Sequence, residues 1–350
     1  MALRDKRILV TGGAGFIGSS LVDALAARGN RVTVLDDLST GKRANLADAL
    51  QTGRVTLVED SILNSDILQA LVPQADVIFH LAVQCLRICF DQPHLVHDVN
   101  ATGTLGLLET AYRLNPGLER FVYVSSSEVY GTARRAPMTE SHPLAPTTTY
   151  GASKLAGELY TQAYVTMYGM PAVIARPFNT YGIREHHEGA SGEVIPRFIV
   201  NLLNDRPPVV FGDGQQTRDF TYVSDTVDGL IRVAECDALL GEAVNIAYGQ
   251  EATIDAIARR LLSLMGRDAL AIQYEAERPA DVRRHYADIT KLRNATGFEP
   301  AVSLAEGLQR AVDWFKSCAQ GDPAALLAQC GAARNWEGVQ KTPCAPTSAR

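Results

Sequence analysis

The feature that most restricts the possible folds is a glycine-rich segment near the N-terminus, placed between an apolar run and an amphipathic run. Ile8–Val10 is short and apolar, which predicts a buried parallel strand. Thr11–Gly18 follows it with the spacing GxxGxxG, and the next apolar residues recur at helical spacing. In this setting Gly12 permits a tight turn, Gly15 lets the backbone approach a pyrophosphate, and Gly18 lets the helix pack closely. The segment therefore predicts a strand, turn and helix of the kind that binds a dinucleotide.

The rest of the first half alternates apolar runs with amphipathic ones. Further strands are predicted at 31–35, 55–58, 77–79, 121–124 and 172–175. Strands that alternate with helices predict parallel pairing, because a helix returns the chain to the same edge of the sheet. We therefore expect an α/β fold, a Rossmann-type doubly wound parallel sheet with a smaller C-terminal substrate-binding lobe.

The second predicted strand, 31–35, ends at two consecutive carboxylates, Asp36 and Asp37. Asp36 follows Gly18 by 18 residues, close to the separation at which the dinucleotide-binding fold places an acidic residue. A carboxylate there accepts hydrogen bonds from the ribose hydroxyls of the adenosine half and would repel a 2′-phosphate. The sequence therefore favours NAD over NADP, with an acidic helix cap or loop residue as the alternative interpretation.

Tyr150 and Lys154 stand four residues apart in a segment whose apolar and small residues recur at helical spacing. On a helix they project from the same face, one turn apart. A nearby ammonium favours the phenolate, so we expect the pKa of Tyr150 to fall from about 10 toward neutrality. Such a phenol could take the proton of a sugar or alcohol hydroxyl while hydride leaves the adjacent carbon. The alternative is an ordinary surface pair.

The strand predicted at 121–124 runs into three serines and Glu128. Open α/β sheets place their sites at the carboxyl ends of the strands, so Ser126 and Glu128 are candidate site residues. A serine-rich turn without a catalytic role is the alternative.

Charge and composition limit the classes of function. The net charge of −6 and pI near 5.7 argue against a nucleic-acid-binding face, since no basic run is available to neutralise phosphates. No apolar stretch reaches the roughly 18 residues that a membrane span requires, and the N-terminus has no signal-peptide pattern. The six cysteines show neither a CxxC framework nor zinc spacing. We therefore expect a cytoplasmic protein with reduced thiols, no metal, and no nucleic-acid or membrane partner.

Five motifs occur together and in order: Thr11–Gly18, Asp36, the strand end at Ser126, Tyr150–Lys154 and Arg176–Gly182. The set resembles the extended short-chain dehydrogenase/reductase family, in its nucleotide-sugar epimerase/dehydratase branch, over residues 6–316. The resemblance implies that Tyr150 is the catalytic acid/base and that Lys154 holds the nicotinamide ribose and lowers the pKa of the tyrosine. It also implies that Ser126 hydrogen-bonds the reacting hydroxyl.

The same resemblance implies the binding residues and the assembly. The residues expected to contact NAD are Gly12, Gly15, Phe16, Ile17, Gly18, Asp36, Asp37, Asp60, Ser61, Leu81, Ala82, Asn100, Tyr150, Lys154 and Pro177. The residues expected to hold a nucleotide sugar, a UDP-sugar above all, are Ser126, Asn179, Val194, Arg218, Arg278 and Asp281. The expected domains are 1–182 for NAD and the catalytic Ser/Tyr/Lys set, 183–317 mainly for the nucleotide sugar, and 318–350 as a peripheral or disordered tail. The family also implies a homodimer.

The implied reaction begins with oxidation at C4 of the sugar, with NAD regenerated in place. A 4-epimerase then returns the hydride to the other face, a 4,6-dehydratase eliminates water, and a decarboxylase releases CO₂ from a uronic acid. Glu128 resembles the glutamate that dehydratases and decarboxylases use near C5, and it is a further candidate catalytic residue. Ser127, however, stands where dehydratases of thymidine-diphosphate sugars carry Asp, and the segments 80–84 and 278–289 look like those of UDP-hexose epimerases. We therefore expect a UDP-hexose 4-epimerase, with a dehydratase, a decarboxylase and a non-catalytic NAD-binding sensor as alternatives.

Three positions depart from the family pattern. The segment Cys85–Phe90 lacks the usual serine, Ile183 replaces a proline, and Ala280 replaces a glycine. The first leaves the polarity of the pocket open, and the other two bear on the nucleotide loop. None of them removes a catalytic group.

Overall fold

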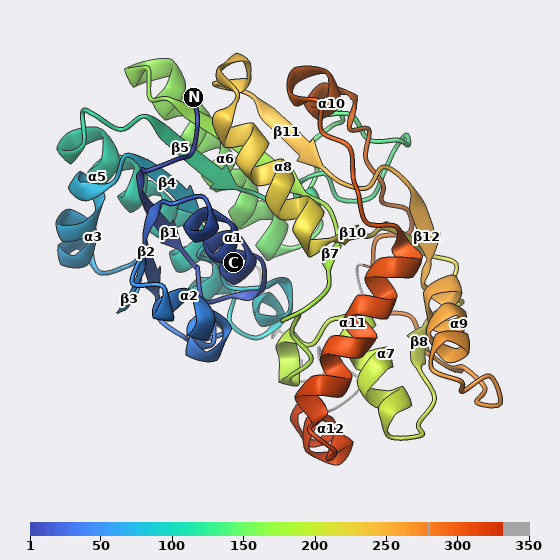
Figure 1. Ribbon diagram of the computed structural model, residues 1–350. Helices are drawn as coiled ribbons and strands as arrows, with labels where there is room; N and C mark the ends of the chain where they lie inside the picture. Colours follow the sequence, from blue (N-terminus) through green and yellow to red (C-terminus); the bar gives the residue numbers. More distant parts are fainter. Residues whose placement is uncertain (279–280, 332–350) are drawn as a thin grey trace, which may run out of the picture.

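The computed structural model describes residues 1–278 and 281–331, and a seven-stranded parallel sheet forms its centre (Figure 1). The strand order is β11-β6-β5-β4-β1-β2-β3, and every neighbouring pair is parallel. The strands are β1 (Arg7–Thr11), β2 (Arg31–Asp36), β3 (Val55–Glu59), β4 (Val77–His80), β5 (Arg120–Val124), β6 (Ala172–Pro177) and β11 (Ala243–Ile246). The expected doubly wound α/β sheet is confirmed, and such sheets bind ligands where the strand order reverses, here beside β1 and β4.

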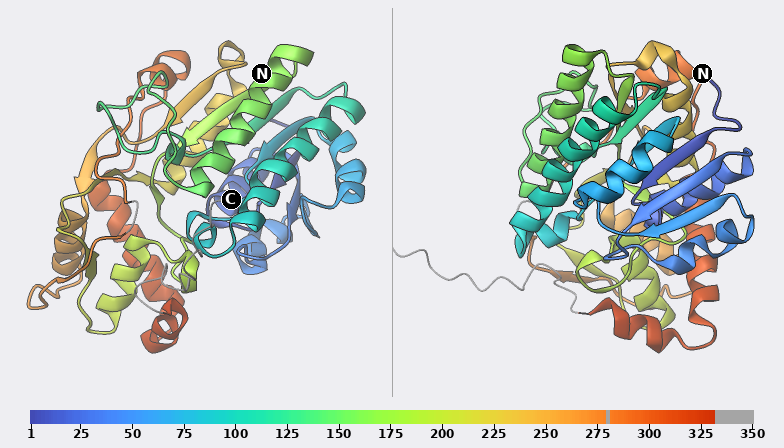
Figure 2. Two further views of the ribbon diagram at one scale, coloured as in Figure 1. Left: turned by 180° about the vertical axis from the view of Figure 1, so that it is seen from behind. Right: turned by 90° about the vertical axis from the view of Figure 1, so that its left-hand side faces the viewer.

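Helices cover both faces of the sheet (Figure 2). Successive residues of a strand point to opposite faces, so Ile8 and Val10 join one buried cluster while Leu9 joins another. The first cluster includes residues of α1 (Phe16–Ala27), α8 (Val223–Glu235) and α10 (Thr290–Thr296). The second packs against α3 (Ser65–Leu71), α5 (Thr104–Leu114) and α6 (Thr149–Tyr168). The short helices α2 (Ala47–Gln51) and α4 (Pro93–His97) lie beside α1 and α6.

A second lobe lies to one side of the sheet and has its own apolar core (Figure 1). Its helices are α7 (Val194–Leu203), α9 (Ile254–Leu264), α11 (Leu304–Ala319) and α12 (Pro323–Cys330). Three short strand pairs accompany them: β7 (Thr180–Tyr181) with β10 (Thr221–Tyr222), β8 (Val209–Phe211) with β13 (Gln273–Glu275), and β9 (Thr217–Asp219) with β12 (Glu251–Thr253).

The chain crosses between the two cores more than once after residue 183. α8, β11 and α10 pack with the central sheet, whereas α7, α9 and α11 build the second lobe. The division at residue 182 therefore stays a prediction about roles along the chain and does not coincide with a boundary between the cores. The apolar pattern does not predict β11, because the strand is short and contains Asn245. The buried Asn245 accepts a hydrogen bond from the Tyr130 hydroxyl at 2.7 Å and donates to the Met138 carbonyl at 2.9 Å.

The end of the described chain is helical. α12 follows α11 and packs against α7, with Leu326 and Cys330 buried in the core of the second lobe. The part of the expected tail up to residue 331 is therefore folded rather than disordered, because it covers apolar side chains. Residues 332–350 lie outside the described residues, as does Ala280. None of the helices in the described ranges combines the length and apolar character that crossing a membrane requires.

Candidate active site

A cavity of about 440 Å³ opens where the sheet meets the second lobe. Its walls are formed by residues that follow the carboxyl ends of the strands and by facing residues of α6, α7, β8 and β9. Of the expected site residues, those that line it are Gly12, Gly15, Phe16, Ile17, Gly18, Asp36, Asp37, Asp60, Leu81, Ala82, Ser126, Glu128, Tyr150, Lys154, Pro177, Asn179, Val194, Arg218, Arg278 and Asp281. Segments far apart in the sequence are thus brought to one cavity.

The glycine-rich loop joins β1 to α1 at one end of this cavity. Gly12 has a φ of +70°, and a Cβ there would lie 2.6 Å from the backbone nitrogen of Ala82. A Cβ on Gly18 would lie 2.1 Å from the carbonyl oxygen of Gly12. The tight turn and the close packing that the sequence predicts are therefore confirmed, since only glycine fits both places.

The N-terminus of α1 is left open to a ligand. Its N-cap residue, Gly15, has no side chain that could cap the first turn, and α1 begins at Phe16. The first N–H groups of a helix have no intrahelical partner, and with the positive end of the helix dipole they attract an anion. Because Phe16, Ile17 and Gly18 line the cavity, this end fits the pyrophosphate of a dinucleotide.

Asp36 ends β2 beside the glycine-rich loop. Its carboxylate oxygens accept hydrogen bonds from the backbone N–H groups of Ala14 and Leu38, both at 2.9 Å. Burial raises the pKa of Asp36, while these two hydrogen bonds act in the opposite direction. The group is held in place at the cavity wall together with Asp37, where it fits the ribose hydroxyls of an adenosine.

Two expected cofactor contacts, Ser61 and Asn100, do not line the cavity. The Ser61 N–H donates to Asp60 at 2.7 Å, next to the wall. Asn100 is buried, accepts from the N–H of Gln84 at 2.8 Å and donates to Ser153 of α6 at 3.0 Å. Asn100 therefore fixes the cavity loop that contains Gln84 against α6.

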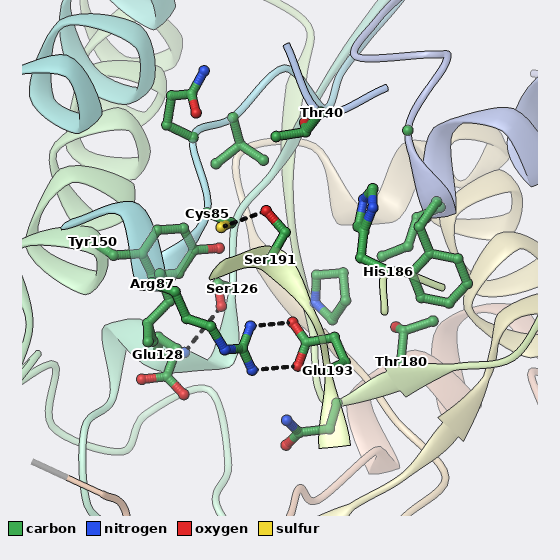
Figure 3. A pocket seen from close by; sticks show the side chains of 18 of the residues that line it. Thr40, Cys85, Arg87, Ser126, Glu128, Tyr150, Thr180, His186, Ser191 and Glu193 are labelled. Carbon is green, nitrogen blue, oxygen red and sulfur yellow. Dashed lines mark hydrogen bonds and ion pairs between the residues drawn. The ribbon is translucent and has the colours of Figure 1, made fainter. Parts of the chain in front are cut away.

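Tyr150 and Ser126 face the same part of the cavity (Figure 3). Tyr150 lies in the first turn of α6, which Thr148 caps by accepting the N–H of Gly151 at 3.0 Å. Ser126 follows β5, and its hydroxyl accepts the N–H of Glu128 at 3.2 Å. The helical placement expected for Tyr150 is confirmed.

The pKa of Tyr150 departs from the sequence-based expectation. It is raised rather than lowered: burial is the main cause, the nearby Ser126 hydroxyl acts in the opposite direction, and the Glu128 carboxyl adds to the rise. The expectation is wrong because it considers a nearby cation and leaves out the removal of water from the phenol.

Lys154 also differs from an exposed lysine. Its ammonium donates to the Val124 carbonyl at 2.7 Å and lies 4.5 Å from the centre of the Tyr123 ring. Burial lowers the pKa of Lys154 to about 7, and the Glu158 carboxylate acts in the opposite direction. Near neutral pH this side chain is therefore only partly protonated.

Glu128 lines the cavity close to Tyr150. Burial raises the pKa of its carboxyl group, and the positive charge of Arg218 counteracts this shift. Ser127, its neighbour, also lines the cavity; it is buried, and its carbonyl is 3.1 Å from Nε2 of His285.

Basic side chains gather at the end of the cavity formed by the second lobe. Arg218 donates to Asp281 at 2.6 Å and to the Val282 carbonyl at 2.5 Å. The Arg278 guanidinium lies 5.7 Å from the centre of the Phe211 ring, and burial lowers its pKa to about 10. Two guanidinium groups fixed in this way can hold a diphosphate.

Two further cavity residues, Arg87 and Glu193, are not singled out by the sequence motifs. Arg87 lies in a short 3-10 helix, Leu86–Phe90, and Glu193 is the N-cap residue of α7. Their side chains form two hydrogen bonds, each of 2.7 Å (Figure 3). The one sequence signal is the unusual segment Cys85–Phe90, and spacing cannot pair it with a residue more than a hundred positions away.

Comparison with known proteins identifies the family. A family model described as GDP-mannose 4,6 dehydratase matches residues 9–311. A UDP-glucose 4-epimerase of Mycolicibacterium smegmatis is 37% identical over 90% of this chain and 100% of its own length. UDP-glucuronic acid decarboxylase 1 of Xenopus tropicalis is 34% identical over 89% of this chain and 72% of its own.

A solved structure supports the same family assignment. The dTDP-glucose 4,6-dehydratase DesIV of Streptomyces venezuelae, crystallised with NAD, superposes with a TM-score of 0.85 at 33% identity, over 90% of this chain and 98% of that one. These relatives are named for three different reactions, so they share a family and a fold rather than one activity. The chain is an enzyme that belongs to the extended short-chain dehydrogenase/reductase family, in its NAD-dependent nucleotide-sugar epimerase/dehydratase branch.

Proposed function

We propose that this protein is a nucleotide-sugar 4-epimerase of the UDP-hexose type. The observation that carries the proposal is the composition of the cavity around Tyr150: a phenol and a serine hydroxyl share it, while Ser127 stands buried where a dehydratase would need a second acid. Glu128 is present in the cavity wall, but Ser127 beside it cannot serve as the second acid, and epimerisation at C4 requires no group at C5. The relatives of this chain include a UDP-glucose 4-epimerase that is 37% identical to it.

The glycine-rich loop, Asp36 and Lys154 would hold NAD, with the adenosine half at Asp36 and the nicotinamide ribose at Lys154. When bound, NAD supplies a reversible hydride acceptor at the sugar's C4. Domain 1–182 would thus carry the cofactor and the Ser/Tyr/Lys set, and 183–317 mainly the nucleotide sugar.

The proton chemistry falls to Tyr150 and Ser126. As a phenolate, Tyr150 would take the proton of the C4 hydroxyl, and it would return that proton to the C4 oxygen once the keto sugar has rotated and hydride has been delivered to its other face. The positive charge of bound NAD would favour this phenolate against the effect of burial. Ser126 would hold the reacting hydroxyl by a hydrogen bond, and Asn179, Val194, Arg218, Arg278 and Asp281 would keep the nucleotide diphosphate in place during the rotation.

The runner-up functions are a 4,6-dehydratase and a UDP-glucuronate decarboxylase. They are supported by the presence of Glu128 in the cavity wall and by relatives named for both activities. Each would require the Glu128 carboxylate close to C5, whereas epimerisation at C4 requires no group there.

Two substitutions separate these functions. Tyr150→Phe should lower kcat by about 10²–10⁴-fold, the usual contribution of a positioned acid/base, and leave NAD bound. Glu128→Gln, which keeps the shape of the side chain, should lower kcat by far less in an epimerase. Steady-state kinetics with UDP-glucose measures both. A loss of activity in Glu128→Gln as large as that in Tyr150→Phe would refute the epimerase proposal in favour of chemistry at C5.

We also propose that two copies associate through the outer face of α5 and α6. Apolar and aromatic side chains are exposed there, with Leu159 at 59% and Met167 at 66% exposure, and Tyr112 stacks on Tyr168 with ring centres 4.2 Å apart.

The expected cytoplasmic location is supported by the free thiols of the five cysteines in the described ranges.

A further inference from the structure

The Arg87–Glu193 ion pair closes one wall of the cavity between the sheet side and the second lobe. Arg87 projects from the segment after β4, and Glu193 from the start of α7. Both residues line the cavity, and both bonds of the guanidinium fork are directed at the carboxylate (Figure 3). The Arg87 side chain is 9% exposed, so this cation is withdrawn from water and shared with one partner.

Charges of both signs surround this pair: the carboxyl groups of Glu128 and Glu185 lie near it, and so do the guanidinium groups of Arg218 and Arg278. Glu185 is buried nearby and Glu128 is half-buried, and removal from water raises the pKa of both carboxyl groups. Glu193 keeps a lowered pKa, because Arg87 outweighs the effect of burial on that carboxyl. The negative charge of Glu193 raises the pKa of both Glu128 and Tyr150, whereas the positive charge of Arg87 lowers the pKa of Glu128. The pair therefore borders the same space as the proposed catalytic groups. The positive charge of Arg87 is already neutralised by the carboxylate of Glu193.

We propose that the Arg87–Glu193 pair makes the sugar end of the cavity selective for an uncharged hexose and excludes sugars with a carboxylate at C6. This inference rests on the proposed function of the site. A substrate carboxylate could pair with Arg87 only by displacing Glu193, whose side chain is 40% exposed and would lose both hydrogen bonds to the buried guanidinium. It would also meet the negative charge of Glu193 on approach. An uncharged hydroxymethyl group meets neither cost, so the pair discriminates by repulsion.

The position of the pair separates this role from a purely structural one. The segment before α7 is also tied to the sheet side by the ion pairs Lys42–Glu188 and Arg184–Asp23. The residues of those two pairs do not line the cavity. They hold the segment in place without facing the sugar, and Glu188 offers a matched control for Glu193.

The test is a binding measurement on NAD-loaded Tyr150→Phe protein, in which turnover is suppressed. UDP-glucose and UDP-glucuronate are titrated by calorimetry into this protein and into versions that also carry Glu193→Gln or Glu188→Gln. We expect UDP-glucose to bind at least about tenfold more tightly than UDP-glucuronate in the parent. Glu193→Gln frees the Arg87 fork for a substrate carboxylate and should reduce this ratio at least about tenfold, through tighter binding of UDP-glucuronate. Glu188→Gln should leave the ratio unchanged.

The outcomes distinguish the inference from the function on which it rests. Equal affinity of the parent for the two sugars, or an equal change for both in Glu193→Gln, would overturn the selectivity and leave the epimerase proposal standing. The parent ratio requires no substitution at the pair, so it decides the question even if Glu193→Gln fails to fold. If neither nucleotide sugar binds more tightly than UDP alone, the proposed function and the inference both fail.

Discussion

At the scale of single residues, burial determines the protonation of the proposed catalytic groups more than their spacing does. Tyr150 holds its proton more strongly than an exposed tyrosine, and Lys154 holds its proton more weakly than an exposed lysine. Both shifts favour the uncharged form, as expected for groups removed from water. The helical spacing of the two residues is readable from the sequence, but their pKa values depend on which other segments cover them.

The pKa of Lys154 leads to a pH-dependent stability. The folded protein has a pKa of about 7 at this side chain against an ordinary 10.5, so between these values the unfolded chain binds more protons. The free energy of unfolding should therefore rise with pH across this window relative to a Lys154→Met variant, by at most about 1.4 kcal/mol per pH unit. Below pH 7 the difference between the two proteins should be constant. Urea denaturation at a series of pH values measures it, and a difference that does not change across the window would contradict the burial of a partly neutral lysine.

At the scale of elements, α6 is fixed to the sheet by a buried ion pair directly beneath the site. Arg176 of β6 donates to Glu158 of α6 through Nε at 2.9 Å and through Nη2 at 2.6 Å. Glu158 lies one turn after Lys154, so this pair also sets the position of the turn that carries Lys154. Its charges are nearly inaccessible to solvent, with exposed fractions of 5% and 4%.

Removal of one partner of this pair should lower the stability of the folded protein. Glu158→Ala leaves the Arg176 guanidinium buried without its carboxylate and should lower the free energy of unfolding by about 3–5 kcal/mol. The matched control is Glu109→Ala, which removes an exposed pair with Arg113 on α5 and should cost about 0.5 kcal/mol or less. Denaturant unfolding compares the two variants with wild type. Similar small losses in both would mean that α6 is held by apolar packing alone.

The elements differ in how far the sequence predicts them. The glycine-rich loop, the strand ends and the start of α6 carry local patterns, and the structure brings them to one cavity. β11 lacks such a pattern, because Asn245 is accommodated by partners from two distant segments. The pairing of Arg87 with Glu193 cannot be predicted from the sequence either, because it depends on how the second lobe packs against the sheet.

At the scale of the whole molecule, the two cores place the cofactor loop and the basic diphosphate end on opposite sides of one cavity. The sheet side contributes the glycine-rich loop and Tyr150, while the second lobe contributes Arg218 and Arg278. The outer face of α5 and α6 lies on the sheet side, and exposed apolar residues there, including Leu159 and Met167, are suited to burial against a second copy.

The proposed association is open to a direct test. Wild-type protein should have the mass of a dimer in light scattering, and the double variant Leu159→Lys/Met167→Lys should have the mass of a monomer, because two charges cannot be buried at a helix interface without partners. Tyr274→Lys on β13 is the control, since this exposed residue lies in the second lobe beside Asp255 and should leave the dimer intact. A monomeric wild type, or a dimeric double variant, would rule out this face.

The most direct test of the central claim is the identity of the product formed from UDP-glucose by the NAD-loaded wild-type enzyme. Mass spectrometry and proton NMR on the same sample report the mass of the nucleotide sugar and the configuration at C4. We predict UDP-galactose, with an unchanged mass, an inverted C4 and no accumulation of NADH. A product that has lost water, with a 4-keto group in place of the inverted hydroxyl, would contradict the claim and identify the enzyme as a dehydratase.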